Sequence, residues 1–192
     1  MLMTFLKILL YIPVWLMLPT IFKGKRNIPK GKVIFVCNHR SNFDAVLLAL
    51  STFRNQKYLA KKELFKNKFV GGFLKALGSI PIDRNGTDIK AVKLCLTALK
   101  KGKILTIFPE GTRNKTEQVL GEVKSGACLM AIKSKTPIVP VWISKKPKLF
   151  CINTLTFGKA FTLDEFYNQK LDKETLEQAG NILQEKILEN KK

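Results

Sequence analysis

The run VIFVCNHRSNFD, residues 33–44, decides how the rest of the chain is interpreted. Its first five residues are apolar and mostly β-branched, which predicts a buried strand. The polar residues that follow include His39, the only histidine of the chain. They lead into AVLLAL, residues 45–50, whose pattern predicts a helix. A strand that ends in a polar turn and opens into a helix is a common position for chemistry in α/β folds.

Strands and helices alternate along the whole 192-residue chain. Further strands are predicted at residues 57–60, 79–84, 103–108, 137–143 and 149–157. Further helices are predicted at residues 71–78, 87–101 (with Asp88 in its first turn and Gly102 after its end), 126–132 and from Asp172 onward. The alternation predicts an α/β fold: a single domain with a central mixed, largely parallel sheet flanked by helices. Pro81 predicts that its strand lies at an edge or contains a bulge.

The N-terminal segment is almost entirely apolar. No charge occurs from Ile8 to Phe22, a run of 15 residues. As a helix this run is about 22 Å long, less than the ~30 Å of a bilayer's hydrocarbon core, and Pro13 and Pro19 would kink it. Basic residues follow from Lys23. We therefore expect residues 1–25 to be a helical membrane-anchoring segment, monotopic or re-entrant, on the cytoplasmic face of the cell membrane, with residues 26–192 as the functional domain. A spanning helix and a buried core helix are the alternatives.

The charge of the chain is strongly positive: 34 Lys and Arg against 14 Asp and Glu give a net charge of +20. Such a balance predicts an anionic partner, namely a nucleic acid, an anionic lipid, a phosphorylated substrate or an acidic protein. A lysine-rich compositional bias is the alternative. The four cysteines lack metal-ligand spacing and lie among apolar neighbours, which predicts reduced, buried thiols. Cys37 shares the strand face of His39, so a thiol nucleophile there is a second interpretation.

His39 and Asp44 are the candidate catalytic pair. A neutral imidazole can accept a proton from a hydroxyl group, and a carboxylate on its other nitrogen fixes the tautomer and stabilises the imidazolium. The alternative makes Asp44 a helix N-cap and His39 an ordinary turn residue. No GxSxG motif is present, so a serine hydrolase is disfavoured and the nucleophile would be a hydroxyl of the substrate.

A second candidate is FPEGTR, residues 108–113, where a predicted buried strand ends in a glycine-containing turn. Its guanidinium and backbone amides are suited to holding a phosphate group, and Glu110 can orient Arg113 or bind a substrate hydroxyl. A simple surface turn is the alternative. Lys61, Arg84 and Lys124 are further basic residues beside glycines or strand ends.

Four motifs together carry a resemblance. NHRSNFD (residues 38–44) resembles the N-H-x4-D block of the glycerolipid acyltransferase family. The second, third and fourth blocks are similar to GSIPIDR (78–84), FPEGTR (108–113) and IVPV (138–141), in the same order. Within this family the chain most resembles the bacterial lysophosphatidate acyltransferases. Pro81 and the segment 121–123 depart from the usual pattern, which bears on substrate selectivity more than on the reaction.

The resemblance implies transfer of a fatty acyl group from acyl-CoA or acyl carrier protein to the sn-2 hydroxyl of 1-acyl-sn-glycerol 3-phosphate. The product would be phosphatidate, made in phospholipid biosynthesis without a metal or other cofactor. In this interpretation His39 deprotonates the hydroxyl and Asp44 orients His39. The substrate-binding residues implied by the resemblance are Lys61, Arg84, Glu110, Gly111, Thr112 and Arg113.

The partners expected from this interpretation are lysophosphatidate, the acyl donor and anionic membrane lipid. Another lysophospholipid or a lyso-amino-lipid as acceptor is an alternative. A basic nucleic-acid-binding protein is a more distant one, because the chain has no recognisable nucleic-acid-binding motif and the apolar N-terminus would have no role in it.

Overall fold

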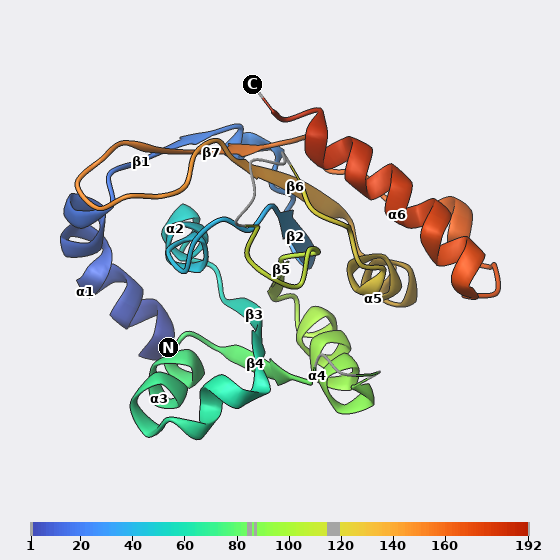
Figure 1. Ribbon diagram of the computed structural model, residues 1–192, viewed down its shortest axis with the longest axis horizontal. Helices are drawn as coiled ribbons and strands as arrows, with labels where there is room; N and C mark the ends of the chain where they lie inside the picture. The colour runs from blue at the N-terminus through green and yellow to red at the C-terminus, as the bar shows by residue number, and fades with distance from the viewer. Residues whose placement is uncertain (1, 84–85, 87, 115–119, 192) are drawn as a thin grey trace.

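A computed structural model of the chain describes residues 2–83, 86, 88–114 and 120–191. In this part of the chain one seven-stranded sheet forms the centre of the molecule (Figure 1). Its strands are β1 (Thr20–Lys23), β2 (Val33–Cys37), β3 (Gln56–Lys61), β4 (Ser79–Ile82), β5 (Ile104–Ile107), β6 (Ile138–Ile143) and β7 (Asn153–Phe157). The strand order is β1-β7-β6-β2-β5-β3-β4.

The sheet is mixed and largely parallel, as predicted. Strands β6, β2, β5, β3 and β4 run parallel to one another, whereas β7 pairs antiparallel with β6, and β1 runs parallel to β7. All residues of β2, β5 and β6 are buried, which is typical of parallel strands covered on both faces. Pro81 lies in the edge strand β4, as predicted. A proline is tolerated there because its missing N–H does not remove a hydrogen bond between two central strands.

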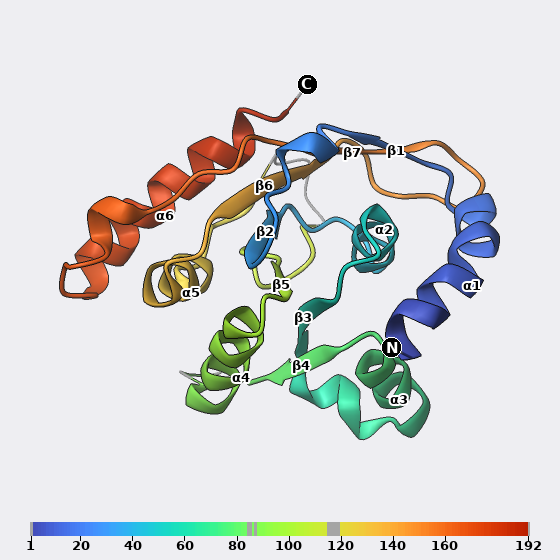
Figure 2. The ribbon, with the colours of Figure 1, turned by 180° about the vertical axis from the view of Figure 1, so that it is seen from behind.

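Helices cover both faces of the sheet (Figures 1 and 2). They are α1 (Leu2–Met17), α2 (Asp44–Ser51), α3 (Lys68–Ala76), α4 (Ile89–Lys100), α5 (Gly126–Ser134) and α6 (Lys173–Leu188), with short 3-10 helices at Lys25–Asn27, Lys62–Lys66 and Asp164–Phe166. Alternate strand residues face opposite cores: Ile34 packs with α4, α5 and α6, whereas Phe35 packs with α2 and the end of α1. The sheet thus has a hydrophobic core on each of its faces, and the turn after β2 begins at the end of a strand that is buried between the two.

The predicted helix ends are confirmed. Asp88 accepts a hydrogen bond from the backbone N–H of Ala91, and Asp172 accepts one from that of Thr175. Gly102 ends α4 with a φ of +69°, a left-handed conformation that glycine adopts without steric cost.

Two segments differ from the sequence prediction. Thr20–Lys23 was expected to be the end of the anchoring segment, but it forms β1, because Pro19 ends the helix and the extended chain pairs with β7. Residues 149–152 were expected to begin a strand, but β7 begins at Asn153. The residues before it form a loop whose Phe150 has a φ of +57°, outside the strand region.

Helix α1 lies along the left-hand side of the molecule in Figure 1 and packs against α2. It is 16 residues long and contains Pro13. Within the part of the chain that the structure describes, every helix is too short or too polar to cross a membrane. The outer surface of α1 exposes the large apolar side chains of Ile8, Leu9, Leu10, Ile12, Trp15, Leu16 and Met17.

Candidate active site

The predicted site residues gather where the parallel strands end. The carboxyl ends of β2, β5, β3 and β6 lie at one edge of the sheet, because these strands share a direction. The turn at His39 follows β2, the turn at Glu110 follows β5, and Lys61 is the last residue of β3. Segments that are more than 20 residues apart in sequence are thereby brought to one edge.

His39 and Asp44 form the predicted contact. The Nδ1 atom of His39 lies 2.7 Å from Oδ2 of Asp44, whose side chain is completely buried, whereas the His39 side chain remains 17% exposed. A carboxylate only accepts hydrogen bonds, so Nδ1 carries the proton and Nε2 is left as the acceptor. This tautomer is the one that a general base requires.

Asp44 is not the N-cap of α2. Its Oδ2 atom also accepts hydrogen bonds from the backbone N–H groups of Arg40 (2.6 Å) and Ser41 (2.8 Å). The carboxylate is therefore turned back toward the turn, while the N-cap position is taken by Phe43, which makes no side-chain cap. The backbone holds the carboxylate in place, and the carboxylate in turn holds the imidazole.

The turn after β5 fixes His39 from the other side. The imidazole stacks on the ring of Phe108, with a centroid distance of 4.1 Å and an interplanar angle of 20°. Glu110 accepts a hydrogen bond from the backbone N–H of His39 at 2.7 Å, and the carbonyl of His39 accepts one from the N–H of Asn114 at 2.7 Å. Both the ring and the backbone of His39 are thus held by residues 108–114.

Glu110 joins two other segments of the chain through its carboxylate. It is buried, and its second oxygen accepts a hydrogen bond from the backbone N–H of Gly121 at 2.8 Å. A methyl group on Gly121 would lie 2.8 Å from that oxygen, so a larger residue there would displace the Glu110 carboxylate. Glu110 thus joins the turn at His39 to residue 121.

Cys37 is fully buried beneath the turn. Burial raises the pKa of its thiol well above the ordinary value, and the neighbouring carboxylates of Asp44 and Glu110 raise it further. Both effects disfavour a thiolate nucleophile at neutral pH.

A family model described as "Acyltransferase" matches residues 20–144, about two thirds of the chain. The chain belongs to the acyltransferase family. Among its relatives is a 1-acyl-sn-glycerol-3-phosphate acyltransferase of Bacillus subtilis, 37% identical over 119 residues, which make up 61% of this chain and 58% of that protein. The protein with the same name from Streptococcus pneumoniae is 32% identical over 158 residues, covering 79% of this chain and 57% of that protein. This acyltransferase chain thus spans a little over half the length of these relatives.

A solved structure has the same fold. The crystal structure of the 1-acyl-sn-glycerophosphate acyltransferase from Thermotoga maritima matches this chain with a TM-score of 0.68 and 24% identity, over 97% of this chain and 77% of that chain. The likeness extends the fold assignment to nearly the whole chain, beyond the residues that the family model matches.

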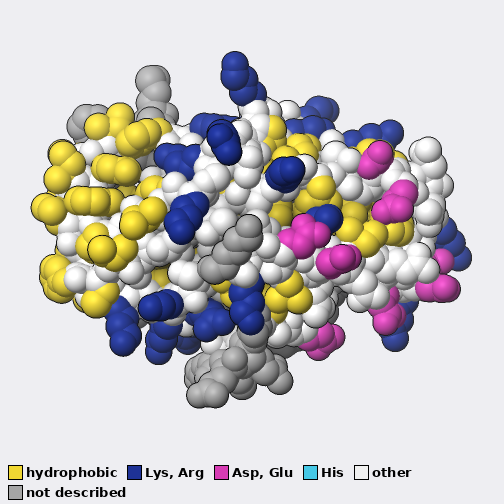
Figure 3. Space-filling view, turned by 90° about the horizontal axis from the view of Figure 1, so that it is seen from above, with side chains coloured by type: hydrophobic (Ala, Val, Ile, Leu, Met, Phe, Trp, Pro, Cys, Tyr) yellow, Lys and Arg dark blue, Asp and Glu magenta, His cyan; other side chains and the backbone are white. Residues whose placement is uncertain are grey.

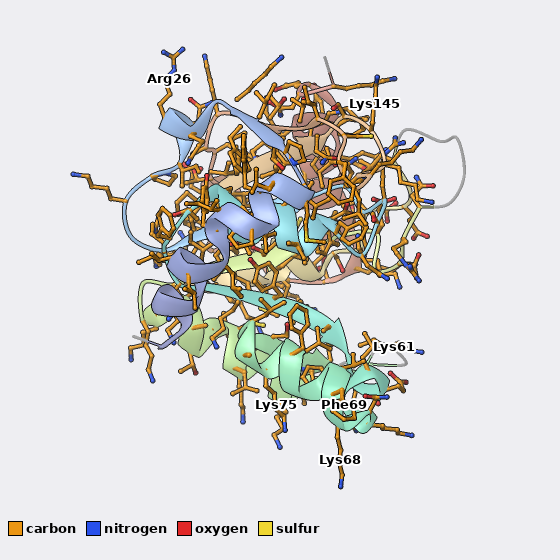
Figure 4. The ribbon with its side chains drawn as sticks, turned by 90° about the vertical axis from the view of Figure 1, so that its left-hand side faces the viewer. Arg26, Lys61, Lys68, Phe69, Lys75 and Lys145 are labelled. Atoms are coloured by element: carbon orange, nitrogen blue, oxygen red, sulfur yellow. The ribbon has the colours of Figure 1, made fainter. Side chains whose placement is uncertain are left out.

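Of the predicted substrate-binding residues, those that the structure describes lie at the same edge of the sheet. Gly111 has a φ of +69° and forms the turn, and Thr112 and Arg113 follow with exposed side chains. Lys61 is half-exposed, 3.7 Å from Glu63, and projects at this edge in Figure 4. Glu110, as described above, points inward. Arg84 lies outside the described residues.

One residue of the site, Asn38, had no predicted role, and Lys124 was named from the sequence only as a further basic residue. Asn38 joins β2 to β6, because its side-chain amide donates to the carbonyl of Ile143 (3.0 Å) and accepts from its N–H (2.8 Å). Its position directly after a buried strand was the available signal. Lys124 lies over the turn after β5: a methyl group on Gly111 would be 3.3 Å from its Nζ atom. It adds a cation beside Gly111.

The titratable groups at this edge are a histidine, two carboxylates and cations. Among residues 2–83, 86, 88–114 and 120–191, no three His, Cys, Asp or Glu side chains gather closely enough to hold a metal ion. The described groups are suited to proton transfer and to binding an anion.

Proposed function

We propose that this protein transfers a fatty acyl group from an acyl thioester to the sn-2 hydroxyl of 1-acyl-sn-glycerol 3-phosphate, which gives phosphatidate. The observation that carries the proposal is the 2.7 Å contact between Nδ1 of His39 and the buried carboxylate of Asp44. The names of the relatives from B. subtilis and S. pneumoniae support the choice of substrate.

The proposed reaction begins with a proton transfer. Nε2 of His39 accepts the proton of the sn-2 hydroxyl as its oxygen attacks the thioester carbonyl, and the Asp44 carboxylate stabilises the imidazolium that forms. The tetrahedral intermediate then collapses with cleavage of the carbon–sulfur bond. The departing thiolate takes the proton from Nε2, so that His39 returns to its neutral form and no acyl-enzyme is made.

The cations at the edge of the sheet would bind the acceptor's phosphate. Arg113 is on the turn after β5, next to Gly111, and Lys124 lies over that turn. Lys61 ends the neighbouring strand β3. A phosphate held by these residues would place the sn-2 hydroxyl near His39, since the turns after β2 and β5 are joined by hydrogen bonds.

The N-terminal segment would hold the enzyme at an anionic membrane, on its cytoplasmic face. The support is the exposed apolar surface of α1, together with the net charge of +20. Both the acceptor and the product of the proposed reaction are anionic lipids, so an enzyme at the bilayer surface would meet them there.

The test is an assay of the purified protein with lysophosphatidate and other lyso-acceptors, and with acyl-CoA and acyl carrier protein donors, the products being identified by mass. His39→Ala should lower turnover by roughly 10²–10⁴-fold, the usual contribution of a general base. Arg113→Ala should mainly raise KM for lysophosphatidate. Lys93→Ala, on the exposed surface of α4, is the matched control for loss of a cation.

Two results would overturn the proposal. Near-normal turnover by His39→Ala would exclude His39 as the base. Mass spectrometry of the protein incubated with acyl donor alone should show no acyl adduct, and a stoichiometric adduct would contradict direct transfer. Preference for another lysolipid would keep the reaction and replace the acceptor.

A further inference from the structure

We propose that the loop between β6 and β7, residues 144–152, is a second membrane-inserting element that acts beside α1 on an anionic bilayer. The inference rests on the membrane association proposed above. It adds a part of the chain that lies more than 100 residues after the N-terminal segment, where the sequence had predicted the start of a strand.

The loop combines exposed cations with exposed apolar side chains. Lys145, Lys146 and Lys148 are exposed, and three large apolar residues follow them. Phe150 is 74% exposed and Ile152 is 72% exposed, with Leu149 beside them. Large apolar tips next to lysines are typical of segments that enter the boundary between lipid headgroups and acyl chains.

Hydrogen bonds with the side chain of Asn153 hold the loop in a defined conformation. The side chain of Asn153 is buried and accepts a hydrogen bond from the N–H of Lys148 (3.2 Å), while its amide donates to the carbonyl of Cys151 (2.9 Å). Phe150 has a φ of +57°, a left-handed conformation that bulky residues rarely adopt. A strained aromatic residue with an exposed side chain receives no compensation from burial within the chain. Strained backbone conformations of this kind are concentrated at functional sites, which favours a functional role for Phe150.

The loop is attached to the end of α1. The backbone N–H of Phe150 donates to the carbonyl of Met17 at 2.7 Å, and that of Asn153 donates to the carbonyl of Pro19 at 2.8 Å. The exposed apolar residues of the loop are therefore continuous with those at the end of α1. Figure 3 shows hydrophobic side chains gathered at the left-hand end of the molecule, where α1 and this loop lie in Figure 1.

Cations border this apolar surface. Figure 4 views it with α1 in front: Lys145 lies above, Arg26 lies at the upper left, and Lys68 and Lys75 lie below. An apolar centre with a basic border is complementary to an anionic bilayer, where the lysines meet the headgroups and the apolar residues enter below them. This charge pattern favours lipid as the occupant.

The position of the loop links membrane contact to the site. The loop begins directly after Ile143, whose backbone is bonded to the side chain of Asn38. Asn38 directly precedes His39. Because the loop and the turn at His39 are joined in this way, insertion of the loop would fix the distance between the turn and the bilayer surface. A soluble acyl donor and a lipid acceptor would then meet at the edge of the sheet.

The experiment uses Cys151, which is exposed, whereas Cys37, Cys95 and Cys128 are buried. The full-length protein is labelled there with an environment-sensitive nitrobenzoxadiazole dye. It is then mixed with phosphatidylcholine vesicles, with or without phosphatidylglycerol. The dye emission should rise severalfold and shift to shorter wavelength with the anionic vesicles, and lipids with nitroxide groups on their acyl chains should quench it. The control is Cys151→Ser with Gln178→Cys, labelled on the exposed face of α6, which should not respond.

A second measurement tests the side chains without relying on the dye. Phe150→Asn together with Ile152→Ser should weaken vesicle binding roughly tenfold or more, because two large apolar groups lose their transfer into lipid. Asparagine tolerates the left-handed conformation at position 150, so the loop should be retained. The matched control is Ile89→Asn with Leu94→Ser, which removes two exposed apolar side chains from α4 and should leave binding unchanged.

The outcomes separate this inference from the proposed function. If the protein binds vesicles but the Cys151 dye is silent and the loop variant binds normally, the loop proposal is overturned and the α1 anchor stands. If the protein does not bind vesicles at all, both membrane proposals fail, whereas acyl transfer to micellar lysophosphatidate tests the reaction independently. A dye response to acyl carrier protein alone, with none to vesicles, would assign the loop to a protein partner and overturn the proposal.

Discussion

In most proteins charged side chains are exposed and large apolar ones are buried. The turn at His39 and the outer surface of α1 each break one half of this rule. At the turn, the carboxylates of Asp44 and Glu110 are buried, whereas on α1 large apolar side chains are exposed. Buried carboxylates are tolerated because backbone N–H groups bond to them. The exposed side chains of α1 gain nothing comparable from the chain itself.

This contrast shows where each region finds its stabilising partners. The turn is complete within the fold, so its function should be sensitive to changes of one or two atoms. The α1 surface lacks such partners within the chain, so under the proposed membrane attachment it should tolerate polar substitutions structurally while losing vesicle binding. Three sets of variants test this difference, from the largest expected effect to the smallest, and two predictions on the buried thiols follow them.

Asp44→Asn should have the largest effect. The amide oxygen can still accept the hydrogen bonds of Arg40, Ser41 and His39, so the turn should remain folded, but the charge that stabilises the imidazolium is lost. We expect kcat to fall by roughly 10²–10⁴-fold with a nearly unchanged melting temperature. Steady-state kinetics and thermal unfolding measure this. A kcat within a factor of three of the original would show that Asp44 only shapes the turn.

Glu110→Gln distinguishes positioning from substrate binding. The amide nitrogen of glutamine would face one of the two N–H groups, of His39 or Gly121, and leave it without an acceptor. We expect a loss of about 1–3 kcal/mol in the free energy of unfolding and a lower kcat. KM for lysophosphatidate should change less than about twofold. A selective rise in KM with normal stability would support the substrate-binding role expected from the sequence instead.

Ile12→Gln with Leu16→Gln tests the α1 surface. Both side chains are exposed, so the free energy of unfolding should change little, but vesicle binding should weaken by about tenfold or more because the apolar transfer is lost. Sedimentation with anionic vesicles and urea unfolding provide the two measurements. The α4 variant Ile89→Asn with Leu94→Ser serves again as the control. Unchanged binding would remove α1 from the membrane contact.

The buried thiols should make the stability of the protein depend on pH. Burial raises the pKa of Cys95 and of Cys128 to about 12. The unfolded thiols ionise from about pH 8.5, so the stability that these groups contribute is fully present below that pH and is lost as the pH rises toward 12. At pH 10 we expect a loss of about 1–2 kcal/mol for each group in urea unfolding. Replacing both with alanine should remove their share of this dependence and leave that of Cys37, whose pKa burial also raises.

The same burial predicts thiol accessibility. Native protein at pH 8 should react with a thiol reagent at Cys151 alone, and denatured protein at all four cysteines. Rapid reaction of Cys37 in the native protein would show that the turn opens.

The sequence predicted correctly those features that a single local segment determines, namely a strand and the turn that directly follows it. The strand before His39 and the one before Glu110 could be predicted from apolar runs, and parallel strands must bring their carboxyl ends to one edge. The His39–Asp44 contact could also be predicted, because five residues across a turn into a helix limit the possible arrangements.

The remaining features depend on contacts between distant segments. No local pattern indicates that the carboxylate of Glu110 meets the N–H groups of His39 and Gly121. Likewise, β1 was hidden inside a continuous apolar run, since its partner β7 lies at the other end of the sequence. The apolar residues before Asn153 suggest a strand, but the left-handed Phe150 prevents one.

The position of β1 also has a consequence for how the chain is made. Pro19 and Asn153, which meet at the start of the β1–β7 pair, are 134 positions apart. At ordinary rates of synthesis a ribosome needs roughly 7–27 s to cover that distance. During that interval the N-terminal segment has emerged and β1 has no strand to pair with. The apolar helix is therefore exposed before the sheet that follows it can be completed, so the proposed membrane attachment can precede the final step of folding.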